Sequence, residues 1–479
     1  MVGNVGLWAP VRRPARRMTV ASSALLMALA VAVGTLPPGW GGAGSAVATP
    51  LERPNIVLVL TDDQTMESVA KMPHVSSRND WITFPNAYIE NAMCCPSRAT
   101  ILSGRYDTHT RVTNNGATGN FDATQTMASW LQGAGYRTGL FGKYLNNYPR
   151  IAPQGLVPPG WTTFQALADG KTVYSQYNYD LVSDGVTEYF GYQPADYQVD
   201  VLTGRARQFI QDSGDEPFFL YFAPTATHGP WKASPRRVGM FTDAPVPHNA
   251  ALFNEPDVSD KPSYILNHAQ QNPTVMDTTR RRMWETAVSV DDAMAALDTQ
   301  LEASGEADNT VVIFMTDNGN AFGEHRWIGK ACQYRVCNQT PLLVRYPGQG
   351  KRSIPNMISN VDIASTVAAI AGVSPGGPQD GESFLPLIQG STQWPDEVLH
   401  HWPGHIARDP DDANFVPQFW AIRTRQHLYV ELSTGERELY VLRTDPNELR
   451  NVAGRPLQRE VQAHLAARLA VLKAEALAP

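Results

Sequence analysis

The sequence predicts an α/β protein with a large, mainly parallel sheet flanked by helices, followed by a small antiparallel sheet and a terminal helix. Short, continuous apolar runs such as residues 55–60 and 310–315 are typical of strands buried on both faces. Residues 280–303 have the spacing of a long amphipathic helix that ends near Gly305. From about Trp394 onward, apolar and polar residues alternate between turns, which favours antiparallel strands.

The same patterns locate the other elements. Strands are expected at residues 136–142, 217–222 and 341–347, and helices at 127–131 and 362–371. Residues 419–424, 427–432 and 438–442 predict the antiparallel strands, and 461–476 the terminal helix. Residues 150–215 are expected to be rich in loops, forming either a substrate rim or a solvent-facing insertion, and residues 235–275 are expected to be irregular.

Length and composition set the broad class. A chain of 479 residues with 43% hydrophobic and 18% charged residues suits a soluble globular protein with one large and one smaller domain. We expect a large domain at residues 49–393 and a small α+β subdomain at 394–479. The formal net charge of -7 argues against a nucleic-acid-binding protein, which would carry a basic face.

The first 48 residues have the pattern of an export signal. A basic region precedes an apolar run at residues 24–33, and Ala-Val-Ala at 46–48 predicts cleavage before Thr49. The run is short for a bilayer span, so we expect a secreted protein, with a retained amphipathic anchor as the alternative. The arginine pairs raise a twin-arginine export route, although the flanking residues fit that signal weakly. Cleavage would remove four arginines and change the net charge to -11. These arginines are Arg12, Arg13, Arg16 and Arg17.

The four cysteines form two pairs of different character. Cys332 and Cys337 are five positions apart and could close a small loop in an oxidising compartment. Cys94 and Cys95 are adjacent, which is poor geometry for a disulfide between them. No cysteine or histidine cluster has zinc-site spacing. The adjacent pair in a predicted exported protein therefore calls for another explanation.

Two predicted strands end in the same kind of polar sequence. Asp62 and Asp63 follow the strand at 55–60, and Asp317 and Asn318 follow the strand at 310–315. Ligands of open α/β sheets bind at the carboxyl ends of strands. Three carboxylates and one amide suit a hard cation, Ca²⁺ or Mg²⁺, and the set lacks the histidine that zinc would favour. A solvated turn would explain one such strand end, but two matching ends favour a metal site.

Three further residues are candidates by position. His228 follows the strand at 217–222 and precedes a Gly-Pro turn. Lys143 directly follows the strand at 136–142, and Lys330 lies in a Trp-Ile-Gly-Lys segment. A lone histidine is usually structural and a lone lysine is usually on the surface, so each depends on its surroundings.

Together, these motifs resemble the sulfatase family. Cys94, Pro96, Arg98 and Gly104 match the signature C-x-P-S-R-x-x-x-L-x-G. The likeness extends along most of the chain after residue 48, through Thr-Asp-Asp-Gln, Gly-Lys-Tyr, His-Gly-Pro-Trp, Thr-Asp-Asn-Gly and Gly-Glu-His. Among sulfatases, Cys-Cys-Pro-Ser-Arg, Gly-Lys-Tyr-Leu-Asn-Asn-Tyr and His-Gly-Pro-Trp are most similar to the N-acetylglucosamine-6-sulfatase group. The resemblance implies an alkaline-phosphatase-like fold, with a large mixed, mainly parallel sheet.

The resemblance also implies a covalent modification. A separate formylglycine-generating enzyme would oxidise Cys94 to formylglycine. One hydroxyl of the aldehyde hydrate would attack sulfur and give a covalent sulfate hemiacetal, and the other would expel sulfate as the aldehyde re-forms. The substrate would be a sulfated carbohydrate or an aryl sulfate.

Roles for the candidate residues follow from the same resemblance. Arg98 would hold the hydrate, and Lys143 and Lys330 would offset charge on the sulfuryl oxygens. His228 would protonate the leaving oxygen. Ca²⁺, or Mg²⁺ in its place, would polarise the sulfate. Its ligands would be Asp62, Asp63, Asp317, Asn318 and the modified Cys94.

The sequence departs from the family pattern at two places. Many sulfatases have a histidine two residues after the Gly-Lys lysine, where this chain has Leu145. A His-Gly pair often follows Gly-Arg-Tyr, but Thr110 and Arg111 stand there, with His109 one place earlier. The residue that assists hemiacetal breakdown is therefore open. Asn146, Asn147 or His325 could take the place of the histidine that is absent at position 145, or that contact could be missing.

Other functions remain as alternatives. An arylsulfatase, or a phosphoester or phosphonate hydrolase on the same fold, could use the same residues, because both substrates present a tetrahedral anion. A secreted, calcium-dependent glycan-binding protein is the non-enzymatic alternative. The set Cys94, Arg98, Lys143, His228 and Lys330 argues against it, because a binding protein has no need of these residues.

Overall fold

The computed structural model describes residues 52–148, 157–168, 173–404 and 415–479. The predicted leader and its cleavage site lie outside these residues. Among the described helices, none has both the length and the apolar character that crossing a bilayer requires.

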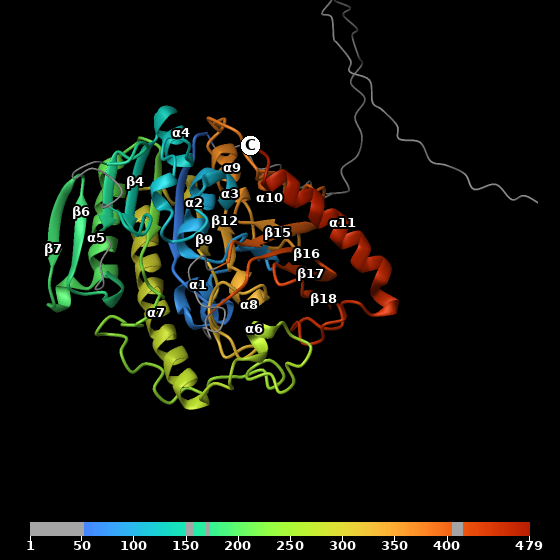
Figure 1. Ribbon diagram of the computed structural model, residues 1–479. Helices are drawn as coiled ribbons and strands as arrows, with labels where there is room; N and C mark the ends of the chain where they lie inside the picture. The colour runs from blue at the N-terminus through green and yellow to red at the C-terminus, as the bar shows by residue number, and fades with distance from the viewer. Residues whose placement is uncertain (1–51, 149–156, 169–172, 405–414) are drawn as a thin grey trace, which may run out of the picture. The chain divides into compact units, whose positions relative to one another are not determined.

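A ten-stranded sheet forms the centre of the described chain (Figure 1). Strands β9, β1, β8, β4 and β5 run parallel to one another, whereas β12 joins β9, β6 joins β5 and β7 joins β6 in antiparallel pairs. The sheet is therefore mixed and mainly parallel at its centre. In sheet order the strands are β13 (Arg352–Ser353), β2 (Ile82–Thr83), β12 (Leu342–Arg345), β9 (Thr310–Thr316), β1 (Asn55–Thr61), β8 (Phe218–Ala223), β4 (Arg137–Gly142), β5 (Thr163–Leu167), β6 (Tyr179–Ser183) and β7 (Val186–Phe190).

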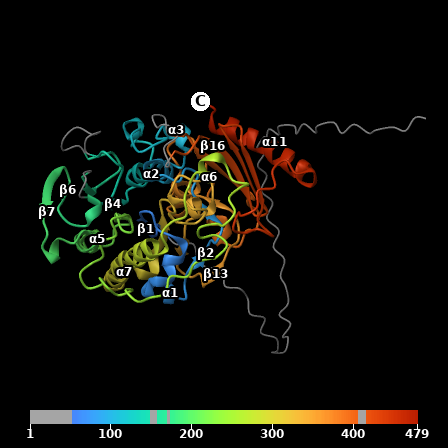
Figure 2. The ribbon, with the colours of Figure 1, turned by 60° about the horizontal axis from the view of Figure 1, so that its bottom comes forward.

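Strand β1 shows why continuous apolar runs occupy the centre. All seven residues of β1 are buried, because both faces of the sheet are covered. Leu58 belongs to a core shared with helices α2 (Cys94–Ser103), α4 (Met127–Gly133) and α9 (Asp362–Ile370). Val57 belongs to a second core, shared with α5 (Gln198–Ser213) and α7 (Pro273–Ala303). Figure 2 shows α7 and α5 together on one side of the sheet.

Two segments differ from the sequence-based expectation. The predicted loop-rich stretch at 150–215 contains β5, β6, β7 and the sixteen-residue helix α5, so that prediction was wrong. Helix α5 buries Val199, Leu202, Ala206 and Phe209, whose three- and four-residue spacing is hidden among polar residues. Helix α7 begins at Pro273, seven residues before the predicted start, because the Asn272 side chain accepts the backbone N–H groups of Thr274 and Val275.

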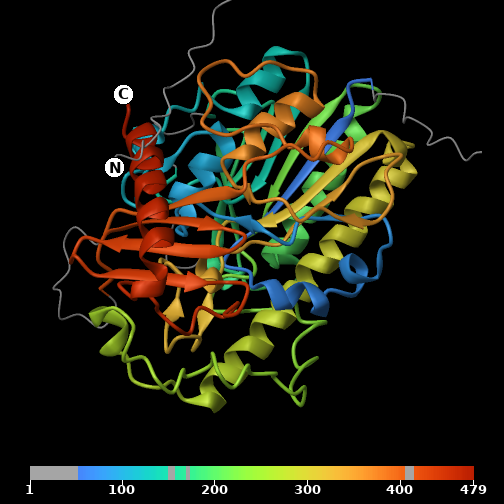
Figure 3. The ribbon, with the colours of Figure 1, turned by 90° about the vertical axis from the view of Figure 1, so that its right-hand side faces the viewer.

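The C-terminal part contains the expected antiparallel sheet and terminal helix (Figure 3). The sheet has four strands rather than the three that alternation predicted, and α11 packs on one face. The additional strand, β15, has five buried residues of six, which conceals its alternation. The elements are β15 (Glu397–Trp402), β16 (Phe419–Thr424), β17 (His427–Leu432), β18 (Arg437–Val441) and α11 (Arg459–Ala476).

Short elements connect these layers. They include two small paired ladders, β3 with β14 and β10 with β11. Their bounds are β3 (Ala87–Tyr88), β14 (Ile358–Ser359), β10 (Ala321–Phe322), β11 (Ile328–Gly329), α1 (Pro73–Ser77), α3 (Asp107–Thr110), α6 (Ser263–Leu266), α8 (Arg335–Asn338) and α10 (Leu385–Ile388), with the 3-10 turns η1 (Met66–Lys71), η2 (Thr118–Asn120), η3 (Val173–Ser175), η4 (Pro194–Asp196), η5 (Ala307–Asn309) and η6 (Pro456–Gln458).

A buried polar cluster joins the C-terminal sheet to the first residue of α3. His401 Nδ1 lies 2.9 Å from both carboxylate oxygens of Asp107, and the His401 ring stacks on Trp420. Glu90 is buried beside them, and its Oε1 has no hydrogen-bond partner. Burial, together with the Asp107 carboxylate, raises the pKa of Glu90 well above its ordinary value.

We expect Glu90→Gln to stabilise the protein above the ordinary pKa of glutamate. There, the unfolded chain releases the Glu90 proton, whereas the folded chain must retain it, so stability falls as pH rises toward the folded-state pKa. Glutamine removes this cost and should raise the free energy of unfolding at pH 7–8 by roughly 1–3 kcal/mol. Denaturant unfolding at several pH values tests this. The gain should vanish near pH 4, and the exposed control Glu216→Gln should show none; a Glu90→Gln protein that is less stable at pH 8 would contradict the expectation.

Candidate active site

Cys94 is the first residue of helix α2. Met93 precedes it in an extended conformation, and all ten residues of α2 are buried. The Cys94 side chain therefore lies at the positive end of a helix dipole that is shielded from solvent. Gly104 ends the helix with φ of 70°, and a Cβ there would lie 2.0 Å from Gln379. The left-handed backbone at this position of the signature favours glycine.

The carboxyl ends of β1 and β9 bring four predicted metal ligands together. Thr61 and Thr316 are paired in register, so the residues that follow them lie side by side. The Asn318 side-chain amide donates to Asp63 Oδ1 at 2.7 Å, and the Asp63 N–H donates to Asp317 Oδ1 at 3.2 Å. Asp62 Oδ1 lies 3.7 Å from Cys94 Sγ. The two strand ends and the helix terminus thus form one cluster.

Three cations surround this cluster. Arg98 donates from Nε to Asp317 Oδ2 at 2.8 Å, and Lys143 Nζ lies 2.6 Å from Asp62 Oδ2. Lys330 Nζ lies 2.5 Å from Asp63 Oδ1 and 2.7 Å from Cys94 Sγ. The structure therefore brings both predicted lysines and the predicted arginine to the predicted carboxylates.

The close contact between β4 and β8 determines the position of Lys143. Gly142 has φ of 121°, and a Cβ there would lie 2.0 Å from the carbonyl oxygen of Ala223. The next residue, Lys143, donates its backbone N–H to the same carbonyl at 2.7 Å. Glycine at the end of β4 therefore allows the close contact with β8 that places Lys143 beside Asp62.

The pKa values of Asp62 and Asp317 are shifted in opposite directions. Burial opposes ionisation of Asp62, but Lys143 and Arg98 outweigh it and hold the pKa of Asp62 well below its ordinary value. Burial and the Asp62 carboxylate raise the pKa of Asp317 to about 6. Burial also raises the pKa of the Cys94 thiol to about 12, so an unmodified thiol here is a poor nucleophile.

The cluster has features of a metal site. Donor atoms of Asp62, Asp63, Cys94 and His228 lie within 4.8 Å of one another, a spacing that could hold an ion. The buried Asn318 Oδ1 has no hydrogen-bond partner. An orphaned amide oxygen beside carboxylates fits a hard cation such as Ca²⁺ or Mg²⁺, which takes oxygen ligands of this kind. The residues present therefore fit a bound divalent ion.

His228 faces the cluster from the segment after β8. Its Nδ1 lies 2.6 Å from the carbonyl oxygen of Gly229, and its Nε2 lies 3.4 Å from Asp63 Oδ2. The side chain is 27% exposed. Because Nδ1 donates to a backbone carbonyl, Nε2 is the ring nitrogen that faces the site. It is therefore the atom that could donate or accept a proton there.

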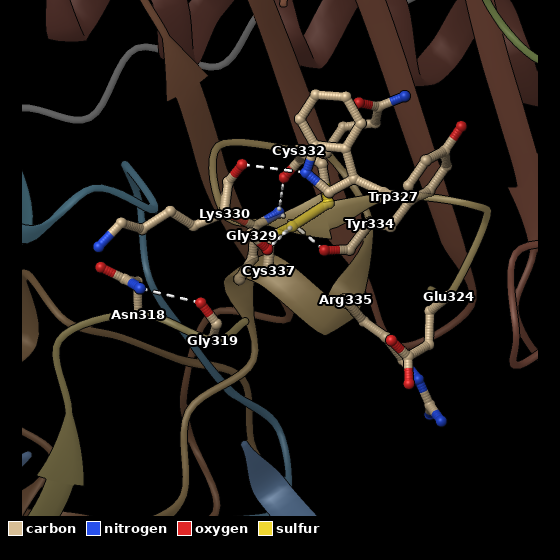
Figure 4. The surroundings of a disulfide bond; sticks show 12 residues. Asn318, Gly319, Glu324, Trp327, Gly329, Lys330, Cys332, Tyr334, Arg335 and Cys337 are labelled. Atoms are coloured by element: carbon tan, nitrogen blue, oxygen red, sulfur yellow. Dashed lines mark hydrogen bonds between the residues drawn. A yellow bond between two sulfur atoms is a disulfide. The ribbon is translucent and has the colours of Figure 1, made fainter. Parts of the chain in front are cut away.

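Lys330 is positioned by a short disulfide loop. Cys332 and Cys337 form a disulfide, as their spacing allowed. Figure 4 shows Lys330 and Asn318 on the same side of this disulfide. Gly319 donates its N–H to the Cys337 carbonyl at 2.8 Å. The loop therefore connects the segment that carries Lys330 to the segment that carries Asn318.

The residues at the departures from the family pattern make contacts outside the cluster. Leu145 is buried in the hydrophobic core. His109 Nδ1 lies 2.7 Å from Asp380 Oδ2, and its Nε2 lies 2.9 Å from the carbonyl oxygen of Ala478. His325 is buried, 2.7 Å from Glu255 and stacked on Tyr334. The polar contacts of His109 and His325 thus go to other groups.

Two residues near the site were not identified from the sequence. Tyr174 stacks on His228, with ring centroids 4.1 Å apart. Cys95, to which the sequence assigned no role, accepts the Asn146 N–H at its Sγ, 3.1 Å away. Neither residue follows a strand end or carries a charge, so only the folded chain reveals their positions.

Comparison with known proteins identifies the family. Residues 54–373 match the family model "Sulfatase", and residues 323–475 match "N-sulphoglucosamine sulphohydrolase, C-terminal". N-acetylglucosamine-6-sulfatase of Capra hircus is 32% identical over 462 residues, covering 85% of this chain and 81% of the relative.

Solved structures show the same fold. One, in complex with its substrate D-glucosamine-2-N,6-O-disulfate, has a TM-score of 0.75 and 24% identity, covering 89% of this chain and 98% of its own. Phosphonate monoester hydrolase of Agrobacterium radiobacter has a TM-score of 0.69 and 22% identity, covering 89% and 96%.

These similarities define the class to which the protein belongs. Its fold is the alkaline-phosphatase-like fold, with a large mixed sheet and a small C-terminal antiparallel sheet. The sulfatase model spans more than half of the chain, and the chain therefore belongs to the sulfatase family. The predicted fold class, family and enzyme class, a sulfuric ester hydrolase, are confirmed.

Proposed function

We propose that this sulfatase hydrolyses the 6-O-sulfate of N-acetylglucosamine-type sugars in glycans, with formylglycine at position 94. The observation that carries the proposal is the position of Cys94. It lies at the buried start of α2, 2.7 Å from Lys330 Nζ and 3.7 Å from Asp62 Oδ1. A residue held between a lysine and a metal-ligand candidate is placed to attack a bound anion. The sugar specificity is supported by the 32% identical relative.

Formylglycine would supply a nucleophilic hydroxyl, and a Ca²⁺ or Mg²⁺ ion would polarise the sulfate. The chain's own residues provide the rest. Asp62, Asp63, Asp317 and Asn318 would hold the ion with residue 94, and Arg98 would orient the group at that position. Lys143 and Lys330 would stabilise charge on the sulfuryl oxygens, and both keep a raised pKa because Asp62 and Asp63 outweigh their burial.

His228 is the proposed general acid. It is the titratable side chain that combines partial exposure with an Nε2 directed at the cluster, 3.4 Å from Asp63. Protonation of the departing sugar oxygen requires such a group, because an alkoxide is a poor leaving group. The group that assists release of sulfate is left unassigned, because the polar contacts of His109 and His325 go to Asp380 and Glu255.

Secretion is part of the proposal. The leader pattern supports it, and the Cys332–Cys337 disulfide suits an oxidising compartment. A stable membrane anchor and a nucleic-acid partner are not proposed. The proposal includes two domains, at residues 49–393 and 394–479. It also includes a formylglycine-generating enzyme as the partner that modifies Cys94 during maturation.

A substrate panel tests the function. Protein produced with a formylglycine-generating enzyme is assayed on N-acetylglucosamine 6-sulfate, galactose 6-sulfate, 4-nitrophenyl sulfate and 4-nitrophenyl phosphate. We expect the highest kcat/KM among the sugars on N-acetylglucosamine 6-sulfate, and preference for the aryl sulfate over the aryl phosphate. Faster hydrolysis of the phosphate would favour the phosphoester or phosphonate hydrolase alternative, whose fold neighbour is 22% identical. Hydrolysis of the aryl sulfate alone would favour an arylsulfatase.

A further inference from the structure

Tyr174 covers one side of the imidazole that faces the active site. It lies in η3, between β5 and β6, far in sequence from His228. The two rings are stacked, with centroids 4.1 Å apart and an angle of 25° between their planes. Lys143 Nζ lies 5.1 Å from the centroid of the Tyr174 ring. Tyr174 therefore contacts one proposed catalytic residue and lies close to a second.

The tyrosine is held at its hydroxyl end. Its hydroxyl donates to Asn146 Oδ1 at 3.3 Å, and the Asn146 N–H in turn donates to Cys95 Sγ at 3.1 Å. Cys95 is the residue next to Cys94 on α2. The ring is thus connected, through two hydrogen bonds, to the start of the helix that carries the nucleophile position.

The backbone around Tyr174 shares an anchor with His228. Gln176 Nε2 donates to Thr225 Oγ1 at 2.8 Å, and Thr225 Oγ1 donates to Gln198 Oε1 at 2.6 Å. Gln198 Nε2 donates to the Val173 carbonyl at 2.7 Å. The Thr225 carbonyl accepts the His228 N–H at 2.9 Å. Thr225, which is fully buried, therefore fixes both segments relative to each other.

The contacts of the imidazole explain why this support is needed. Among the described residues, His228 makes polar contacts with the Gly229 carbonyl oxygen at Nδ1 and with Asp63 Oδ2 at Nε2. The first partner belongs to the adjacent residue, so this contact does not tie the imidazole to another segment of the chain. The ring is also partly exposed. Stacking on a fixed aromatic ring restricts rotation of the imidazole and keeps Nε2 directed at the cluster.

We propose that Tyr174 is a positioning residue that holds His228 in the orientation needed to protonate the leaving oxygen. This inference rests on the proposed role of His228 as general acid. It does not depend on the identity of the sugar. The ring, rather than the hydroxyl, does most of the positioning, because the stacking contact is made by the ring and the hydroxyl bond is long.

A leaving-group series separates positioning from general damage. Protonation matters most for substrates whose leaving oxygen is basic, and least for nitrophenyl sulfates. Wild-type, Tyr174→Ala, Tyr174→Leu, Tyr174→Phe and His228→Ala proteins are assayed on 4-nitrophenyl, phenyl and 4-methoxyphenyl sulfate. We expect Tyr174→Ala and Tyr174→Leu to lose roughly 10- to 100-fold in kcat/KM on 4-methoxyphenyl sulfate and less than about 3-fold on 4-nitrophenyl sulfate. Tyr174→Phe should remain within about 3-fold of wild type on all three.

Two controls complete the experiment. Tyr177 lies three residues further on and contacts Tyr197 rather than His228, with centroids 5.6 Å apart. Tyr177→Ala should show no dependence on the leaving group. Tyr174→Ala combined with His228→Ala should be no slower than His228→Ala alone, because both changes remove the same function. Thermal melting of each variant identifies loss of folded protein.

The outcomes are distinct. Uniform loss across the series for Tyr174→Ala, or an additive double variant, would overturn the positioning role. A His228→Ala protein with uniform loss would show that His228 is not the acid, and would overturn the inference with it. Failure of wild-type protein on N-acetylglucosamine 6-sulfate, with the aryl series behaving as expected, would reject only the proposed substrate.

Discussion

Cys94→Ala is expected to lower sulfatase activity by at least about 10³-fold, the largest effect of any change in the site. Alanine cannot be converted to an aldehyde, so no nucleophile would stand between Lys330 and Asp62. The side chain is 1% exposed, and alanine fits the same space. The measurement is the initial rate of sulfate release, with thermal melting to show that the variant folds.

Cys95→Ser is the matched control. Cys95 is equally buried, and a serine oxygen could accept the Asn146 N–H in place of sulfur. We expect its activity to remain within about 10-fold of wild type, because the change leaves Cys94 in place. Mass spectrometry of the peptide containing residue 94 should show a mass lower by about 18 units than the cysteine peptide in wild type and in Cys95→Ser. Full activity in Cys94→Ala, or an unmodified thiol in active wild-type protein, would reject the mechanism.

Removal of divalent cations is expected to inactivate the enzyme and lower its Tm. A cation that binds only the folded state adds about 2.7 kcal/mol of stability when its concentration is 100 times its Kd. It would also offset the burial and the repulsion by Asp62 that together raise the pKa of Asp317 to about 6. Protein treated with EDTA should regain both activity and Tm on addition of CaCl₂ or MgCl₂. The ion that restores both at the lower concentration is the favoured one.

The pH dependence follows from Asp317. In the metal-free folded protein this carboxyl is protonated below about pH 6, and a proton competes with the cation. The rise in Tm caused by Ca²⁺ should therefore be larger at pH 7.5 than at pH 5. Asp317→Asn and Asn318→Ala should reduce the rise, each compared with its own EDTA-treated form. The exposed control Asp215→Asn should not. A calcium response that is unchanged in both site variants would show that the cation binds elsewhere.

Much of the site could be predicted because its residues follow strands directly. A buried parallel strand is recognisable as a short apolar run, and its carboxyl end lies at the ligand-binding edge of the sheet. Asp62, Asp63, Asp317 and Asn318 come directly after two such strands. In the structure Asp63 is hydrogen-bonded to Asp317 and Asn318, and Asp62 and Asp317 both pair with Arg98. Covalent adjacency to a strand end was therefore enough to predict that they meet.

Helix α5 and strand β15 show where prediction from local pattern fails. The apolar positions of α5 are separated by glutamine, arginine and aspartate, so its periodicity is weak until packing reveals the buried face. Strand β15 contains His400 and His401, which are polar yet buried by contacts with Ile89 and Asp107. In both elements, tertiary contacts decide burial and local residue type does not.

The sequence by itself determined the central strands, the family and the charged residues at the strand ends, because each is encoded within a few neighbouring positions. Only the tertiary structure decided which neutral residues support them. Tyr174 and Cys95 reach the site through stacking and hydrogen bonds to segments remote along the chain. Likewise, only the structure shows that His109 contacts Asp380 and that His325 contacts Glu255. These outcomes depend on distances between distant segments, and such distances exist only once the chain has folded.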